Sequence, residues 1–355
     1  MLIYDKIDQK VWEEELSEYL PEQIYDVHCH AWREEDCLHL VDGDASAPST
    51  TEFYHLESLR SEHDEMFPGK QVKGLVFGAG TQETDLEAMN NWLASEAENY
   101  GYDSLLYCHP TWDEYTIEKQ LMNVHLGFKP YWRLAGENVD DVDLTEMISP
   151  AMLSVANKYE LIIMTHIPRK GRLADRRNIK GLHQICAAAP KARFILAHLG
   201  RSYCPELKKH FAEIADIPNL WADCSMVQDW EVIAYFLRFF PYQRLLFGLD
   251  MPIAHEKGKL VCVNGQRHFF TVKPYRWSIH TEPGAYEVRC TLYAYEIIRA
   301  LLKGATEAGL GRDEIKALFW DNAYNLVTPL KEKLVDQRKD ISTTPSDGAI
   351  RHLVP

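Results

Sequence analysis

The sequence predicts an α/β fold, a (β/α)8 TIM barrel with insertions after its first and eighth strands. Short apolar runs alternate with longer amphipathic segments, which is typical of consecutive βαβ units. Eight such runs occur between residues 24 and 247. Within each run the apolar residues are consecutive, as expected for parallel strands covered on both faces. An open doubly wound sheet is the alternative architecture.

The elements follow in order along the chain. The eight expected strands lie at residues 24–27, 74–77, 104–108, 124–128, 161–164, 193–197, 220–222 and 245–247. Helical patterns occupy residues 84–99, 146–159, 178–188, 226–239 and 286–302. Thr84 and Glu87 have the spacing of a capping box at the start of the first of these helices. Eight strands with intervening helices fit a barrel better than an open sheet.

Two insertions, residues 38–70 and 251–283, interrupt the regular spacing. The second contains Asn264-Gly265 between two β-prone runs, which is a strong signal for a two-residue hairpin turn. Both insertions follow the carboxyl ends of strands, where barrel enzymes build their active sites. We therefore expect them to shape or cover a pocket. Residues 1–330 are expected to form one domain, and the polar residues 331–355 a tail.

Composition restricts the partners and the compartment. The formal net charge of −15 repels phosphate backbones, so nucleic acid is not an expected partner. No apolar run approaches the roughly 18 residues that would span a bilayer, and the N-terminus shows no signal peptide. The eight cysteines form no C-x-x-C pair. These features predict a reduced, cytoplasmic protein that acts on a small molecule, with a homo-oligomer as an open alternative.

Residues able to bind a metal stand at the ends of several expected strands. His28 and His30 close the first strand, and alternate residues of a strand point to the same side. His166, His198 and Asp250 follow the fifth, sixth and eighth strands. Any one of these is more simply a buried, hydrogen-bonded histidine or a helix-capping aspartate. Their shared position at the strand ends, which converge in a closed barrel, is what predicts a site.

These residues resemble a known family. Asp26-Val27-His28-Cys29-His30, Thr165-His166, Ala197-His198-Leu199-Gly200 and Phe247-Gly248-Leu249-Asp250 look like motifs of the amidohydrolase superfamily, in its branch of metal-dependent hydrolases and decarboxylases called amidohydrolase family 2. Trp320-Asp321-Asn322-Ala323 is similar to the last helix of that branch, so the resemblance runs from about residue 24 to residue 326. The motifs are fairly specific for the superfamily and poorly specific for the substrate.

The resemblance implies a role for each matching residue. One divalent metal ion would be bound by His28, His30, His166 and Asp250, with zinc as the default and Mn²⁺, Fe²⁺ or Ni²⁺ as alternatives. His198 would act beside the metal as a base or as a donor that polarises the substrate. Asp250 would also accept a proton from the metal-activated water and pass it to the leaving group.

Lysine and arginine side chains follow the same strands. Lys129 ends the fourth strand, where some family members carry a carboxylated lysine that bridges two metals. The preferred interpretation is an ordinary lysine that contacts the substrate or a neighbouring carboxylate, and a lysine paired within the barrel core is the third alternative. Arg133, Arg169, Arg172 and Arg201 also lie on the expected active face. Because an arginine fork binds carboxylates through paired hydrogen bonds, Arg133, Arg169 and Arg201 predict a carboxylated substrate.

The sequence thus predicts a metal-dependent hydrolase acting on a small, carboxylated lactone, ester or amide. Non-oxidative decarboxylation is the alternative reaction, since the family performs it with the same ligands. A binding barrel without catalysis is disfavoured because every expected ligand position is filled. The dinucleotide and P-loop glycine motifs are absent from the sequence.

Overall fold

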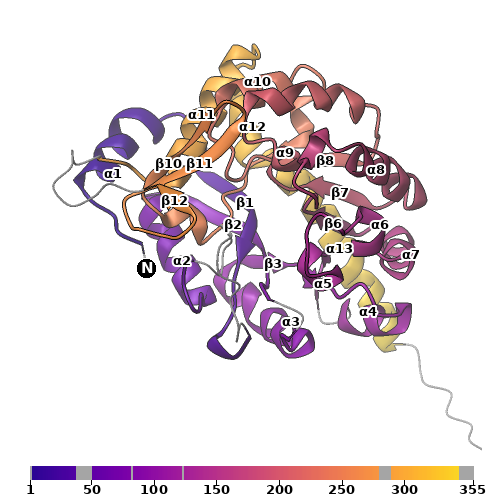
Figure 1. The fold of residues 1–355 in the computed structure, drawn as a ribbon. Coiled ribbons are helices and arrows are strands. Elements are labelled where there is room, and N and C mark those ends of the chain that lie inside the picture. The colour runs from indigo at the N-terminus through magenta and orange to yellow at the C-terminus, as the bar shows by residue number, and fades with distance from the viewer. Residues whose placement is uncertain (1, 37–49, 81–82, 122–123, 280–288, 344–355) are drawn as a thin grey trace, which may run out of the picture.

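The computed structural model describes residues 2–36, 50–80, 83–121, 124–279 and 289–343. Parallel strands form its centre (Figure 1), and they lie where the sequence predicts them. Their bounds are β1 (Gln23–His30), β2 (Gln71–Phe77), β3 (Tyr102–Ser104), β4 (Leu106–Tyr107), β5 (Gly127–Lys129), β6 (Ile162–Thr165), β7 (Arg193–Leu196), β8 (Leu220–Asp223) and β9 (Leu245–Leu246). The expected third strand is represented by β3 and β4 together. Nearly all residues of these strands are buried, which explains their consecutive apolar residues.

The strands form two parallel sheets, β1-β2-β3 and β4-β5-β6-β7-β8-β9. The backbone N–H of Leu105 donates to Val76 and that of Leu126 to Ser104, so hydrogen bonding continues from one sheet to the other. At the far edge, Val27 donates to the carbonyl of Phe247, and Asp250 donates to the carbonyl of His28. This α/β arrangement is consistent with the predicted TIM barrel. It also brings the carboxyl end of β1 beside the segment that follows β9.

Helices surround the strands in Figure 1. The α-helices are α1 (Lys6–Val11), α2 (Leu56–Met66), α3 (Leu86–Glu96), α4 (Glu114–Leu121), α5 (Trp132–Ala135), α6 (Leu144–Met147), α7 (Pro150–Tyr159), α8 (Arg176–Ala188), α9 (His198–Arg201), α10 (Trp230–Phe236), α11 (Tyr293–Glu307), α12 (Arg312–Phe319) and α13 (Asp321–Thr343). A single π-helical turn, η1 (Trp12–Leu16), follows α1. Short 3₁₀ segments are η2 (Glu34–Asp36), η4 (Ala97–Tyr100), η5 (Arg172–Ala174), η6 (Pro205–Glu213), η7 (Tyr242–Arg244) and η8 (Ile253–His255).

Capping residues set the helix starts differently from the periodicity alone. The side chain of Asp85, rather than Thr84, accepts the backbone N–H of Ala88 and caps α3. Ser149 caps α7, whose first residue is Pro150, so the expected helix at 146–159 divides into α6 and α7. Ser and Asp side chains satisfy N–H groups that the helix itself leaves unpaired, and Pro suits the first helical position.

The polar segment expected to be a tail from residue 331 is instead helical as far as Thr343. Leu330 and Leu334 of α13 are buried, and Lys331 forms ion pairs with Glu98 and Asp103 at 3.1 and 2.8 Å. The helix passes behind the strands in Figure 1. Residues 344–355 lie outside the described part of the chain.

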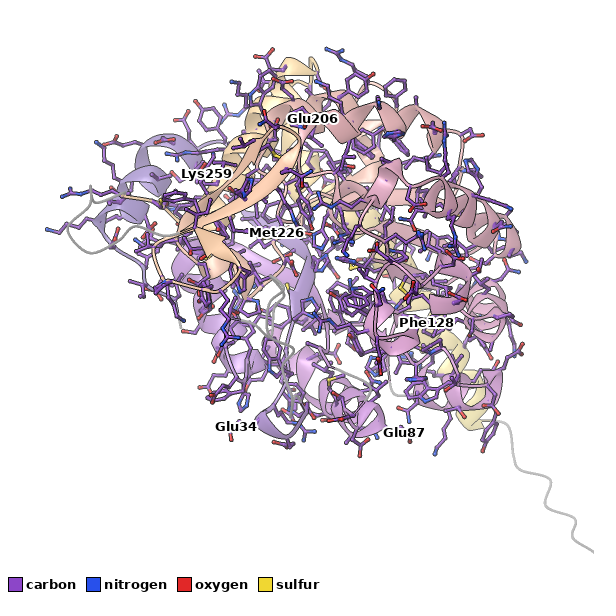
Figure 2. All side chains as sticks on the ribbon, viewed as in Figure 1. Glu34, Glu87, Phe128, Glu206, Met226 and Lys259 are labelled. Carbon is purple, nitrogen blue, oxygen red and sulfur yellow. A yellow bond between two sulfur atoms is a disulfide. The ribbon has the colours of Figure 1, made fainter. Side chains whose placement is uncertain are left out.

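The second insertion contains the expected hairpin. Strands β10 (Gly258–Val263) and β11 (Gln266–Thr271) pair antiparallel, and β12 (Ser278–Ile279) pairs with β11. Asn264 and Gly265, at the turn, have φ values of 51° and 73°, as a two-residue hairpin turn requires. The tip lies beside Glu206 of η6, which is labelled in Figure 2. Residues 38–49 of the first insertion lie outside the described residues, and the rest of this insertion contains α2.

A disulfide joins Cys204 and Cys262 and so ties the hairpin to the segment before η6. This corrects the expectation that the cysteines are all reduced. The spacing of 58 residues carries no signal for such a pair, because only the position of the insertion brings the two sulfurs together. Among the described helices, none is both long enough and apolar enough to cross a membrane.

Candidate metal centre

Three imidazole rings converge on the carboxylate of Asp250. The Nε2 atoms of His28 and His30 each lie 3.4 Å from Oδ1 of Asp250, and Nε2 of His198 lies 3.9 Å from Oδ2. All four residues are buried, each less than 10% exposed. His28 and His30 end β1, His198 follows β7 and Asp250 follows β9. The convergence arises because parallel strands end at the same edge of the sheet.

The other nitrogen of each ring is held by a neighbour. Nδ1 of His30 lies 2.9 Å from the carbonyl of Gly78, and Nδ1 of His198 lies 3.1 Å from the carbonyl of Ser225. Because a carbonyl only accepts, these two rings carry their proton on Nδ1 and turn a lone pair on Nε2 toward Asp250. Nδ1 of His28 lies 3.0 Å from Oδ2 of Asp223. Such partners fix the tautomer and orientation of metal-bound histidines.

The protonation states fit a cation between these groups. Burial lowers the pKa of His30, and burial lowers the pKa of His198 to about 3, so both rings are neutral at neutral pH. Burial alone would raise the pKa of Asp250, but His28, His30 and His198 outweigh it and lower the pKa. The Nε2 lone pairs and the Asp250 carboxylate are all hydrogen-bond acceptors, so no proton lies between them to form a hydrogen bond. A divalent cation would be the natural partner of all four groups.

The predicted ligand set and the observed cluster differ in one member. Ligand atoms of His28, His198 and Asp250 all lie within 4.8 Å of one another, so His198 is as close to the carboxylate as a ligand would be. The His166 ring packs edge-on against His198, with the ring centres 5.2 Å apart. Nδ1 of His166 is buried and has no hydrogen-bond partner among the described residues. A buried ring nitrogen without a hydrogen-bond partner at this position is what we expect of a histidine that binds a metal ion.

The sequence analysis missed Asp223 and Ser225, which contact His28 and His198 of the cluster. Oδ1 of Asp223 accepts the backbone N–H of His198 and of Ser225, each at 3.0 Å, while Oδ2 contacts His28. Ser225 Oγ lies 2.8 Å from Nδ1 of His198. Asp223 ends β8, after the apolar run Leu220-Trp221-Ala222. The strand-end rule that identified Asp250 would have identified it as well.

Asp26 braces the same region. Its Oδ1 accepts the backbone N–H of His28 and of Leu249, each at 3.0 Å, and so joins the two segments that carry His28 and Asp250. Its Oδ2 lies 3.2 Å from Nε2 of His63 of α2. Asp26, Cys29 and His63 are close enough to resemble a second metal cluster. The Cys29 thiol donates to the backbone carbonyl of Asp26, and burial raises the pKa of this thiol well above its ordinary value.

Strained backbone concentrates at this end of the strands. His198, Leu199, Met226 and Asp250 all have positive φ, between 49° and 71°. Non-glycine residues in this region each cost about 1–3 kcal/mol, and they are found mostly where function requires a particular side-chain direction. Gly248 allows the close approach of the segments. A Cβ atom there would lie 3.1 Å from Cβ of His28 and 3.4 Å from those of Asp223 and Ser225.

Lys129 is buried at the end of β5, with 1% of its surface exposed. Burial lowers its pKa to about 8, although Asp223 and Asp250 oppose the shift. Its Nζ lies 4.8 Å from the centre of the Phe77 ring. Among the described residues, no carboxylate lies within ion-pair distance of Nζ. Lys129 is therefore a lysine buried at the end of a central strand, and its amine loses its proton more easily than that of an exposed lysine.

The three predicted arginines lie in different surroundings. Arg201 donates through Nη1 to the carbonyls of Ile167 and Arg169, at 3.1 and 3.3 Å, and its charge helps burial lower the pKa of His166. The guanidinium of Arg133 lies 4.9 Å from the Trp132 ring. Arg169 instead pairs with Asp175 at 2.8 Å and donates to the carbonyl of Asp140. The structure therefore assigns Arg169 to bracing its own loop rather than to the cluster.

A model of the amidohydrolase family matches residues 25–327, which include every residue of the cluster. The chain belongs to the amidohydrolase family. This confirms the resemblance found in the sequence. The family comprises metal-dependent hydrolases and decarboxylases. No curated protein matches this amidohydrolase by sequence.

Solved structures similar to this amidohydrolase include both kinds of enzyme. An amidohydrolase from Burkholderia multivorans with bound zinc shares 12% identity over 86% of this chain and 99% of its own, with a TM-score of 0.56. A 5-carboxyvanillate decarboxylase from Novosphingobium aromaticivorans with bound manganese shares 12% identity over 88% and 98%, with a TM-score of 0.54. A probable 2-pyrone-4,6-dicarboxylic acid hydrolase from Acinetobacter baumannii shares 14% identity over 86% and 99%, with a TM-score of 0.50. At such identities the likeness shows the shared fold.

Proposed function

We propose that this amidohydrolase is a single-metal hydrolase of a small, carboxylated lactone, ester or amide. One observation supports the proposal most directly. The Nε2 atoms of His28, His30 and His198 point toward the Asp250 carboxylate, while each Nδ1 atom contacts an oxygen of another residue. We further propose that the strands close into a (β/α)8 barrel, which the hydrogen bonds between β1 and the segment after β9 support.

The proposed ligands are His28, His30, His166 and Asp250, with zinc as the first choice among divalent ions. A bound divalent ion would polarise the substrate carbonyl and lower the pKa of a water molecule from 15.7 to about 7. Asp250 keeps its carboxylate ionised beside three imidazoles and can accept a proton from an attacking water. His198 is neutral and holds its proton on Nδ1, so its Nε2 presents a lone pair that can accept a hydrogen bond at the reacting centre.

Substrate orientation falls to the cations at this end of the barrel. Burial raises the pKa of Tyr131, and the charges of Arg133 and Arg201 oppose this shift, so both guanidinium groups lie in the neighbourhood of that ring. The Tyr131 ring packs against His166, with ring centres 5.3 Å apart. We assign Arg201, Arg133 and Lys129 to carboxylate binding beside the metal. Arg169 is left out because Asp175 already neutralises it.

The test combines a metal count with product analysis. Protein purified without added metal is analysed by plasma emission spectroscopy and then assayed against lactones, amides and aromatic carboxylic acids. We expect about one ion per chain and release of an acid from a carboxylated lactone or amide. Two ions per chain would overturn the single-metal proposal and favour the alternative in which Lys129 bridges two metals as a carbamate. Release of carbon dioxide in place of a new acid would show the decarboxylase alternative.

A further inference from the structure

Two arginines that come from different parts of the chain lie over one tyrosine. The guanidinium carbon of Arg267, on β11, lies 4.5 Å from the centre of the Tyr203 ring, and that of Arg172, in η5, lies 5.5 Å from it. Arg267 also lies 5.2 Å from the Phe269 ring. Arg267 was not among the residues predicted from sequence, because it lies in the second insertion.

These two cations have no anionic partner in the described part of the chain. No carboxylate there lies within 4.0 Å of either guanidinium group. Nε of Arg172 is buried and makes no hydrogen bond with the described residues. Burial, followed by the charge of Arg267, lowers the pKa of Arg172 to about 10. Two neighbouring like charges with unused donors are unfavourable unless an anion binds between them.

The pair adjoins the candidate metal centre. The Tyr203 ring that both cations cover lies 5.9 Å from the His198 ring, measured between centres. A ligand held by the two arginines would therefore extend toward His198 and the cluster around Asp250. The arginine pair is therefore positioned to bind the part of a substrate that lies away from the metal.

The hairpin that carries Arg267 is fixed at this point. Cys262 is the cross-strand partner of Arg267, and its disulfide joins it to Cys204, the residue after Tyr203. The backbone carbonyl of Tyr203 lies 3.4 Å from Sγ of Cys262. The disulfide thus links the residue after Tyr203 to the cross-strand partner of Arg267. Such pre-organisation reduces the entropy lost when a ligand binds.

We propose that Arg172 and Arg267, stacked on Tyr203, form an anion subsite that binds a second carboxylate of the substrate. The substrate class is then a dicarboxylate, with one carboxylate beside the metal and another on this pair. The planar guanidinium fork suits a planar carboxylate and binds it through two parallel hydrogen bonds. This inference deepens the proposed function and rests on it for the identity of the reacting end.

The test is isothermal titration of zinc-loaded protein with matched pairs of acids, isophthalate with benzoate and glutarate with butyrate. Each pair differs by one carboxylate, and the two carboxylates of isophthalate cannot chelate one ion. We expect at least one dicarboxylate to bind about tenfold or more tightly than its partner, the gain typical of one charge-assisted hydrogen-bonded contact. Arg267→Met should bring that ratio close to one. Arg267→Lys, which keeps the charge and loses the fork, should be intermediate.

Lys273→Met is the matched control, since it removes a cation from the same insertion that lies over Tyr275 rather than Tyr203. The idea is overturned if neither dicarboxylate is preferred, if Arg267→Met keeps the ratio, or if Lys273→Met lowers it equally. Thermal melts show whether each variant is folded. Because the experiment measures affinity, it tests the subsite separately from the reaction. A preference for dicarboxylates in a protein that hydrolyses nothing would support the subsite and reject the proposed reaction. Hydrolysis without that preference would support the reaction and reject the subsite.

Discussion

Asp223 contacts both His28 and His198 of the candidate metal centre, although the sequence analysis did not name it. It accepts hydrogen bonds from the backbone of His198 and Ser225, and it holds Nδ1 of His28. Burial would raise the pKa of Asp223, but His28 and His198 outweigh it and lower the pKa, so the group is a carboxylate at all physiological pH values. Its negative charge increases the basicity of His28 as a ligand.

Asp223→Asn should therefore weaken metal binding without removing a ligand. Loss of a carboxylate behind a metal-bound histidine typically lowers metal affinity by about 10–100-fold, and we expect a decrease of that size. The measurement is competition for zinc with a coloured chelator. Asp216→Asn is the control: Asp216 is exposed and lies close to Asp223 in the sequence, so this change should leave the affinity for zinc unchanged. Equal affinities for wild type and Asp223→Asn would show that Asp223 serves folding alone.

The cluster residues were predictable because one rule applied to all of them. His28, His30, His166, His198 and Asp250 each follow a run of buried apolar residues, and parallel strands bring such ends together. Arg267 and Arg169 could not be assigned in this way. Both lie in loops, where no periodicity fixes direction, and their roles depend on neighbours such as Tyr203 and Asp175 that are distant or ambiguous in the sequence.

At the level of elements, a buried ion pair connects the two insertions. Nδ1 of His255, in η8, lies 2.9 Å from Oε2 of Glu62, in α2, and Nε2 lies 3.4 Å from Glu256. Glu62 also accepts hydrogen bonds from Tyr54 and from the backbone of Leu2, and Tyr275 donates to Glu256. Burial alone would lower the pKa of His255 and raise that of Glu62. The hydrogen bonds between the groups outweigh burial in both cases, so the His255 pKa is raised and the Glu62 pKa is lowered.

These directions define a pH window for stability. The contribution of His255 is complete below its unfolded pKa of about 6.5 and is lost as the pH rises through its higher folded pKa. The contribution of Glu62 is complete above its unfolded pKa of about 4.3 and is lost as the pH falls through its lower folded pKa. His255→Gln should destabilise the protein by about 3 kcal/mol near pH 5.5, and by less at pH 9.

Urea unfolding of wild type and His255→Gln across this pH range is the measurement. His183→Gln is the matched control, because His183 contacts a backbone carbonyl of Glu213 rather than a carboxylate. A difference between wild type and His255→Gln that stayed constant from pH 5.5 to pH 9 would contradict a charged pair.

The hairpin gives a second prediction at this level. Cys262→Ser removes the link to Cys204 but keeps every residue of the proposed carboxylate subsite. If the link pre-positions Arg267 over Tyr203, affinity for the preferred dicarboxylate should fall about three- to tenfold, since ordering the free hairpin then opposes binding. Benzoate binding should not change. Titration of both ligands into wild type, Cys262→Ser and Cys186→Ser, which alters a buried free cysteine, separates this effect from general loosening.

For the whole molecule, the order of strands was predictable and the course of the C-terminal segment was not. Strands such as β6 and β7 contain a run of consecutive apolar residues, so their presence is visible in the sequence without knowledge of their neighbours. Helix α13 buries only one face, and its other residues are polar and form ion pairs such as Lys331 with Asp103. Composition therefore suggested a tail. The spacing of Val327, Leu330 and Leu334, all buried, was the available signal of a helix.

The candidate metal centre joins segments from β1, β6, β7 and β9, so metal binding should stabilise the entire fold. An ion that binds only the folded state and is present at about 1,000 times its dissociation constant adds about 4 kcal/mol of stability. Removing it with a chelator should lower the melting temperature by several degrees, and zinc should restore it. The measurement is calorimetry before and after dialysis, with metal content checked in each sample.

His28→Gln tests whether the shift comes from this cluster. Loss of His28 Nε2 removes one of the two imidazole contacts to Oδ1 of Asp250, so the variant should bind zinc poorly and melt at the same temperature with or without chelator. His109→Gln, at a partly exposed histidine whose Nδ1 contacts Thr111, should keep the full shift of the wild type. If the chelator removed the metal and the wild-type melting temperature stayed the same, the ion would not be joining these segments. The close approach of the neutral imidazoles to the Asp250 carboxylate would then have to be explained by another cation or by a proton.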